Sequence, residues 1–229
     1  MVLDENVEVY AKLIVESSAM SLSELVVAFH VKPFRQWSVG DEIVRPHKTF
    51  FQKTNGFSIC STLPINASPE DHIMDICAQL KDFDRNCVRQ MQGQYEAEFR
   101  IGIDKESNKT NYVILEKNFL SIASTIGASI DIDVLYLTDE VSRNDMCAYD
   151  AIVDIYFASS EHCLFSTRGI NAVDGAISYL SRNITDIIAQ RQKKFIFHIV
   201  GDSPIVHLPF SFIELVESRG VSLEFRLEN

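Results

Sequence analysis

The sequence predicts an α+β protein made of two tandem ferredoxin-like α/β-sandwich domains, each with a mostly antiparallel sheet and helices on one face. Three observations favour this fold class. Strand-like and helix-like segments are mixed along all 229 residues, without the one-to-one alternation typical of a parallel sheet. A chain of this length is sufficient for two small domains. Its two halves also end on the same pattern, which indicates a repeated unit.

The repeated pattern is a helix, a glycine and a strand. It occurs in residues 118–137 (NFLSIASTIGASIDIDVLYL) and, 93 positions later, in residues 211–229 (SFIELVESRGVSLEFRLEN). In both copies apolar residues at helical spacing lead to a glycine, Gly127 or Gly220, which suits the left-handed position just past a helix. Strict alternation of apolar and polar residues then predicts a half-buried strand.

The elements upstream of this ending are expected to repeat as well. Each half opens on a predicted strand, 7–17 (VEVYAKLIVES) or 149–159 (YDAIVDIYFAS), and later has a helix followed by a strand. In the first half Ser21 and Glu24 form a capping box for a helix over 21–29. Ser68 and Pro69 open a second helix over 68–83, because serine caps a helix and proline suits its first position. The remaining expected elements are a strand at 95–103, a helix at 174–190 and a strand at 193–200.

The expected domains are residues 1–137 and 148–229. The segment 138–147 (TDEVSRNDMC) is polar and charged and has no apolar periodicity, so it is interpreted as the linker.

Composition and charge predict a soluble protein and argue against nucleic acid and membrane as partners. The formal net charge is −11, and neither half offers the positive field that nucleic-acid binding usually needs. An acidic protein attracts basic partners. No apolar run approaches the roughly 20 residues of a membrane span, and the acidic start lacks the features of a signal peptide. We expect a cytoplasmic protein that contacts no membrane.

The first candidate site is the segment RQWSVGDEI, which holds the only tryptophan. In a functional interpretation Trp37 is a stacking surface, Asp41 a polar anchor and His47 an acid–base partner. In a structural interpretation Gly40 makes a turn, Asp41 bonds nearby backbone amides and Trp37 covers a core edge. The pattern is compatible with both and favours the structural one.

Acidic residues on the repeated strands are the second candidate. Asp131 and Asp133 lie two residues apart, so they fall on one face of the expected strand and could hold a divalent cation. The repeat carries Glu224 and Arg226 at the matching strand, which favours an outward, solvated face over a metal site. Asp131, Asp133 and Glu224 are therefore expected to be exposed acids that could contact a partner.

The sequence carries no recognised catalytic motif. The six histidines have no HxH or HExxH spacing, and there is no phosphate-binding glycine loop or nucleophile elbow. The five cysteines include no CxxC pair, so reduced thiols are expected rather than a disulfide framework or a structural zinc site. We expect no enzyme, no metal and no cofactor.

Several motifs follow one another in the first half in a characteristic order: YAKLIV, WSVGD from Trp37 to Asp41, GFSICS at 56–61, EDHIMDICAQL, YEAEFRIGI and SIASTIGASIDIDVLYL. In these motifs residues 1–137 resemble the bacterial family catalogued as domain of unknown function 4279. The resemblance implies a compact α+β domain. It brings no established enzyme activity, so no catalytic residue is carried over. The second half keeps the closing helix, glycine and strand but lacks W-x-x-G-D, and so looks like a degenerate copy.

Two functions of different classes follow as hypotheses. The first is a non-enzymatic protein-binding module, an immunity-type protein that neutralises a basic toxin domain or another basic partner through electrostatic complementarity. The alternative is a small-molecule-binding or enzymatic domain with a pocket near Trp37, Asp41 and His47 between the halves. A homodimer formed through sheet edges also stays open.

Overall fold

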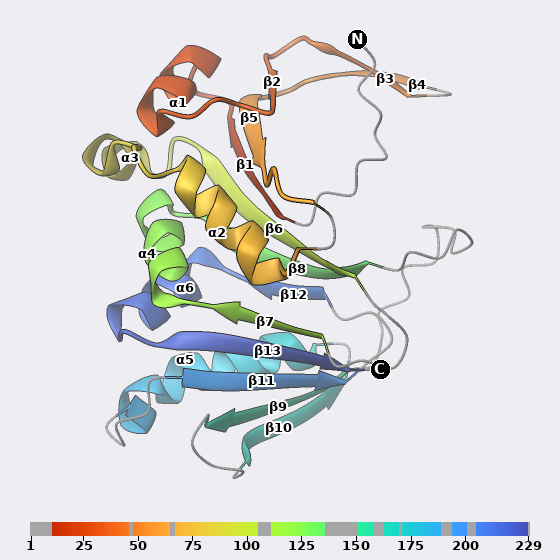
Figure 1. Cartoon of the computed structure of the whole chain (residues 1–229), viewed down its shortest axis with the longest axis vertical. Coiled ribbons are helices and arrows are strands. Elements are labelled where there is room, and N and C mark those ends of the chain that lie inside the picture. Colours follow the sequence, from red (N-terminus) through yellow and green to blue (C-terminus); the bar gives the residue numbers. More distant parts are fainter. Residues whose placement is uncertain are drawn as a thin grey trace. The chain divides into compact units, whose positions relative to one another are not determined.

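The structure is a computed structural model, and it describes residues 11–45, 48–64, 67–104, 111–135, 151–157, 163–169, 171–188, 194–200 and 205–228. These residues form six helices and several sheets whose strands pair mostly antiparallel (Figure 1). The predicted α+β class with mostly antiparallel sheets is confirmed. In the described part of the chain, none of the helices combines the length and the apolar character of a membrane span.

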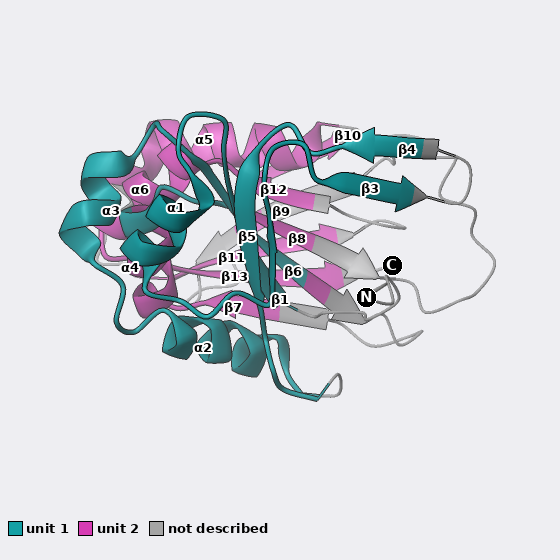
Figure 2. Cartoon of the chain, turned by 90° about the horizontal axis from the view of Figure 1, so that it is seen from above, with its two compact units in different colours: residues 1–101, 125–129 teal, residues 102–124, 130–229 magenta. Residues whose placement is uncertain are grey.

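The chain divides into two compact units (Figure 2), residues 1–101 with 125–129 and residues 102–124 with 130–229. This division differs from the expected boundary, and the expected linker lies outside the described residues. In the second unit β7 (Asn111–Leu115) pairs with β13 (Ser222–Glu228), so strands from both sides of the expected linker share one sheet. The tandem ferredoxin-like arrangement stays a prediction.

The first unit contains a four-stranded antiparallel sheet in the order β6-β1-β5-β2, a separate two-stranded hairpin and three helices. The strands of the sheet are β1 (Ala11–Ser17), β2 (Arg35–Trp37), β5 (Asn55–Cys60) and β6 (Glu96–Asp104). The hairpin is formed by β3 (Glu42–Arg45) and β4 (Lys48–Phe51), and the helices are α1 (Leu22–Phe29), α2 (Pro69–Gln79) and α3 (Arg85–Met91).

One face of this sheet forms the core with the helices. Alternation on β1 buries Leu13 and Val15, and the ring of Phe29 on α1 meets the edge of Phe57 on β5 at a centroid distance of 5.4 Å. Helix α1 begins as predicted, because the Ser21 side chain accepts the Glu24 backbone N–H and the Glu24 carboxylate accepts that of Ser21.

The second unit contains a five-stranded sheet in the order β10-β9-β11-β13-β7. Its central pair, β11 and β13, is parallel, and its other neighbours are antiparallel. A further antiparallel pair joins β8 to β12. The remaining bounds are α4 (Lys117–Ile126), β8 (Ser129–Leu135), β9 (Ala151–Phe157), β10 (Cys163–Gly169), α5 (Ala172–Ile188), β11 (Lys194–Val200), β12 (Ile205–Leu208) and α6 (Phe210–Ser218).

The repeated helix-glycine-strand pattern forms the expected elements at both places. Gly127 after α4 has a φ of 76° and Gly220 after α6 a φ of 64°, the left-handed conformation that favours glycine. The strands that follow have different neighbours, since β8 pairs with β12 and β13 lies between β11 and β7.

Candidate functional site

The W-x-x-G-D segment forms a corner that leads from β2 into the hairpin. Gly40 has a φ of 89°, and the Asp41 carboxylate accepts the Ser38 backbone N–H at 2.7 Å. The backbone N–H of Asp41 donates to the Ser38 carbonyl at 3.0 Å, which closes the turn. The predicted turn at Gly40 is therefore confirmed, and the carboxylate of Asp41 is used within it.

Trp37, the first residue of the corner, packs against the neighbouring strand β5. It pairs in register with Gly56 on β5, and its side chain is 9% exposed. A Cβ placed on Gly56 would lie 2.6 Å from Cζ2 of Trp37 and 2.6 Å from the Val15 carbonyl oxygen. The glycine thus gives the indole ring its space, a cross-strand pairing of aromatic and glycine. Within the described residues the buried indole N–H has no hydrogen-bond partner.

The hairpin continues from this corner and is held at its base. The Gly40 N–H donates to the Gln52 carbonyl and the Gln52 N–H to the Asp41 carbonyl, both at 2.9 Å. The Val39 N–H donates to the side-chain oxygen of Asn55, also at 2.9 Å. The hairpin forms a two-stranded sheet of its own and extends beyond the end of β2 and β5 (Figure 1). A two-stranded hairpin alone is marginally stable in water, so these bonds at its base matter for its orientation.

Exposed apolar side chains gather on this segment. Eight large apolar residues of the described chain are exposed, and five of them lie between positions 34 and 51. They are Phe34 (56% exposed), Val39 (57%), Val44 (71%), Phe50 (38%) and Phe51 (64%), and we call them the hairpin surface. In the hairpin register Glu42 lies opposite Phe51 and Val44 opposite Thr49, so Val44 and Phe51 share one face. Phe50, opposite Ile43, lies on the other face of the hairpin. Exposed apolar side chains that share a face, as those of Val44 and Phe51 do, mark interaction sites in soluble proteins.

The segment that carries the hairpin surface has a positive net charge, whereas the whole chain has a negative one. Residues 32–53 contain five Lys/Arg against two Asp/Glu, a formal net of +3, whereas the rest of the chain carries 16 against 30, a net of −14. Lys32, Arg35 and Lys53 are exposed, and no ion pair involves them in the described part of the molecule. The segment that carries the hairpin surface therefore also carries exposed basic side chains for which the described residues provide no ion-pair partner.

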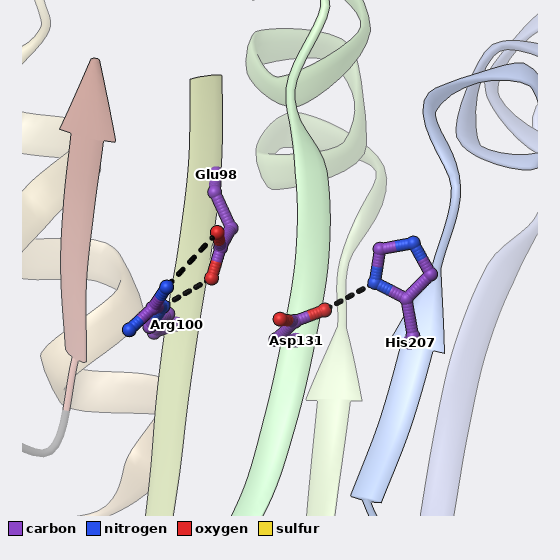
Figure 3. Close-up of polar contacts among 4 residues, drawn as sticks. All are labelled: Glu98, Arg100, Asp131 and His207. Carbon is purple, nitrogen blue, oxygen red and sulfur yellow. Dashed lines mark hydrogen bonds and ion pairs between the residues drawn. The ribbon is translucent and has the colours of Figure 1, made fainter. Parts of the chain in front are cut away.

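The structure places the predicted site residues in separate settings. Trp37 and Asp41 lie within one corner and serve its packing and its turn, and His47 lies outside the described residues. Asp131 on β8 contacts Nδ1 of His207, its cross-strand neighbour on β12 (Figure 3). The side chain of Asp133 lies outside the described part. Figure 3 also shows an ion pair within β6 between Glu98 and Arg100, where the Arg100 guanidinium lies against the carboxylate.

The expectation that Glu224 is an exposed acid is wrong. Glu224 is 8% exposed, and its carboxylate lies 2.7 Å from Nζ of Lys194 and 2.6 Å from Nε of Arg226. Burial by itself raises the pKa of Glu224, but the bonds to Lys194 and Arg226 outweigh it and lower the pKa. Lys194 is in register with Ser222 on the neighbouring parallel strand, which brings its ammonium to the carboxylate. Glu224 is thus committed within its own sheet and is not available to a partner.

A third polar cluster, which the sequence patterns did not reveal, joins the end of β5 to α2. His72, Asp75 and Gln79 share one face of α2, and Nδ1 of His72 lies 2.7 Å from Oγ of Ser61. The Asp75 carboxylate accepts the Thr62 N–H at 2.7 Å and the Gln79 amide at 3.2 Å. Burial lowers the pKa of His72, although Asp75 and Asp71 oppose this. The spacing of His72, Asp75 and Gln79 indicates from sequence that they share a helix face. Their partners Ser61 and Thr62 follow strand β5, and no sequence pattern indicates that contact.

A serine beside a histidine is one requirement of a nucleophilic pair. Here, however, Asp75 bonds both Ser61 and Thr62. Burial by itself raises the pKa of Asp75, but these bonds outweigh it and lower the pKa. A carboxylate at that place opposes the negative charge that an acyl-transfer intermediate builds up near the nucleophile. We therefore assign the cluster a structural role, the attachment of the β5–α2 loop. Among the described residues no group of three or more His, Cys, Asp or Glu side chains could hold a metal ion.

Comparison with known proteins identifies the first part of the chain. The model of the family described as "Domain of unknown function (DUF4279)" matches residues 7–137, more than half of the chain and the region of the predicted resemblance. No curated protein and no solved structure matches. Because this match covers more than half of the chain, the chain belongs to the DUF4279 family.

Proposed function

We propose that this protein is a non-enzymatic protein-binding module that docks through the hairpin surface. The observation that carries the proposal is the concentration of exposed apolar side chains on residues 34–51, with Val44 71% and Phe51 64% exposed. Burying such residues against a partner contributes roughly 25 cal/mol for each Å² removed from water. Hot spots of binding gather where aromatic side chains stand inside a polar rim, and Phe51 shares its face of the hairpin with Glu42 and Thr49.

A narrower form of the proposal is an immunity-type protein of the cytoplasm that neutralises a toxin. The formal net charge of −11 supports it, because a strongly acidic protein is drawn to a basic domain over several ångströms before contact. In this form the charge of the whole chain steers the encounter and the hairpin surface anchors the complex. The second half then serves as a degenerate copy of the first within a tandem ferredoxin-like scaffold.

The test uses two matched variants. The tagged chain, its Val44→Ser/Phe51→Ser variant and its Val27→Ser/Met74→Ser variant are each used to capture proteins from the native cell extract. Val27 and Met74 are 68% and 51% exposed but lie on helices α1 and α2, so they are a control for loss of apolar surface as such. We expect one protein to be captured in stoichiometric amount by the chain and by the helix variant, and to be lost with the hairpin variant. Equal capture by both variants would remove the hairpin surface from the proposal.

The immunity-type form requires a further result. The captured protein must be toxic when it is expressed alone and harmless when it is expressed with this chain. A captured protein without toxicity contradicts this form and leaves the protein-binding proposal in place.

A second candidate function is small-molecule binding beside Trp37. It is favoured by the buried indole N–H, which has no hydrogen-bond partner within the described residues, because buried donors in native structures are usually satisfied. Trp37→Phe keeps an aromatic ring and removes the donor. If a metabolite pool raises the melting temperature of the chain but not that of Trp37→Phe, this candidate gains support; an equal response of both forms contradicts it.

A further inference from the structure

From the charges around the hairpin surface we infer that the surface it meets is acidic: the hairpin docks a protein segment that carries carboxylates beside apolar side chains. This inference rests on the proposed protein-binding function and adds the chemistry of the partner at the point of contact. It applies locally, so a partner that is basic as a whole must still present an acidic patch to the hairpin.

The first argument is the state of the basic side chains. Lys32, Arg35 and Lys53 are exposed and have no ion-pair partner in the described part of the chain. Arg100 and Arg226, by contrast, are each paired with a glutamate two residues away on the same strand, Glu98 and Glu224. Lys32, Arg35 and Lys53 are thus available to an external carboxylate.

The second argument is the state of the local acids. The Asp41 carboxylate already accepts the Ser38 backbone N–H at 2.7 Å. Glu42 is the second of the two acids in residues 32–53, which contain five Lys/Arg. The formal net of +3 over residues 32–53 contrasts with −14 over the rest of the chain. Complementary potentials at an interface select the partner and fix its register, so an acidic segment fits here better than a basic one.

Two other occupants fit less well. A second copy stacked hairpin to hairpin would bring two segments of the same positive charge together, which like-charge repulsion opposes. A single-stranded nucleic acid also favours aromatic and basic residues. Against it, Glu42 lies in register with Phe51, so a carboxylate stands on the face that a base would have to stack on.

The experiment compares defined probes by fluorescence anisotropy. The acidic probe is a labelled strand-length peptide in which phenylalanine and leucine alternate with glutamate, and the basic probe has lysine in place of each glutamate. A labelled oligothymidylate of similar length is the nucleic-acid probe. The proteins are the full chain, the charge-reversed variant Lys32→Glu/Arg35→Glu/Lys53→Glu, and a matched reversal elsewhere, Lys81→Glu/Arg89→Glu/Arg182→Glu. The three control positions are also exposed, and thermal melting establishes that each variant is folded.

We expect the full chain to bind the acidic probe about tenfold more tightly than the basic probe, from three favourable surface pairs of modest strength. Salt at about 0.5 M should weaken this preference because it screens exposed charges. The hairpin reversal should invert the preference, and the matched reversal should keep it.

Three results would overturn the inference. If the basic probe binds at least as tightly and is lost with Val44→Ser/Phe51→Ser, the hairpin binds protein but the partner's sign is wrong. If oligothymidylate binds more tightly than the acidic probe, or if sedimentation shows a dimer that the hairpin variant abolishes, the occupant is wrong. If neither peptide binds and the hairpin variant changes nothing, the proposed docking surface itself fails, together with the inference.

Discussion

The corner at residues 37–41 and the hairpin at residues 42–51 are neighbours in sequence, and both are rich in apolar and aromatic residues. They differ in what those side chains meet. Trp37 is 9% exposed because Gly56 opposite it leaves room for the indole, whereas Phe51 is 64% exposed and has Glu42 as its cross-strand neighbour. In these two strand pairs the aromatic side chain opposite a glycine stabilises the fold, and the one opposite a glutamate remains on the surface.

The largest effect is expected for the tryptophan itself. Trp37→Ala removes a buried ring and leaves its slot empty, which should lower the free energy of unfolding by about 3 kcal/mol. Denaturant titration followed by circular dichroism measures the change. Phe51→Ala is the matched control, since it removes an aromatic ring that is 64% exposed. Similar losses for the two variants would break the comparison.

A slightly smaller loss of stability is expected when Gly56, which leaves room for the indole, gains a side chain. The added methyl of Gly56→Ala meets the Val15 carbonyl oxygen as well as the indole, and we expect destabilisation of about 2 kcal/mol. Because part of the clash involves Trp37, the losses of Trp37→Ala and Gly56→Ala should not add in the double variant. Gly175→Ala, inside helix α5, is the control, because the added Cβ meets only the Thr167 side chain, at 3.8 Å. The stability of this variant should be unchanged or rise by about 0.5–1 kcal/mol. Full additivity would contradict the proposed contact.

The turn between the two regions should show an intermediate effect. Asp41→Ala leaves the Ser38 N–H without its carboxylate acceptor, at a cost of about 1 kcal/mol for an exposed bond. Asp41→Asn keeps an oxygen acceptor and should lose less. The melting temperatures of the two variants make the test, and equal losses would mean that the side-chain bond contributes little.

The smallest effect on stability is expected on the hairpin surface. Val44→Ser/Phe51→Ser changes exposed side chains, so the free energy of unfolding should stay within about 0.5 kcal/mol, while binding of the acidic probe falls. A large loss of stability would place these residues in the fold and end the comparison. Unchanged binding would remove their functional role.

The local elements could be predicted from the sequence where local chemistry determines them. The capping box of Ser21 and Glu24, the cap at Ser68 and the left-handed glycines after α4 and α6 all follow from residues within one or two turns. Helix α3 was missed because its start depends on Asp84, which directly follows the predicted helix 68–83 and whose carboxylate accepts the backbone N–H groups of Asn86 and Cys87. Apolar periodicity alone does not register such a break.

What depends on distant partners could not be predicted in the same way. Glu224 has the alternating position of an outward residue, and its burial results from Lys194 on the parallel neighbour. The hairpin carries no two-residue turn signal, so its exposed face was not foreseen. Charge totals over the two halves also concealed the positive segment, which a count over a window of about twenty residues would have shown.

The pairing of β7 with β13 has a consequence for how the second unit folds. Leu115 and Leu223, which lie opposite each other in this pair, are 108 positions apart. During synthesis β7 emerges long before its partner, and its side toward β13 remains open for several seconds at ordinary elongation rates. Long-range pairing of this kind slows folding and leaves strand edges open to wrong partners. Assembly of the second unit thus depends on the ribosome finishing β13, and chaperone demand during translation should concentrate in that interval.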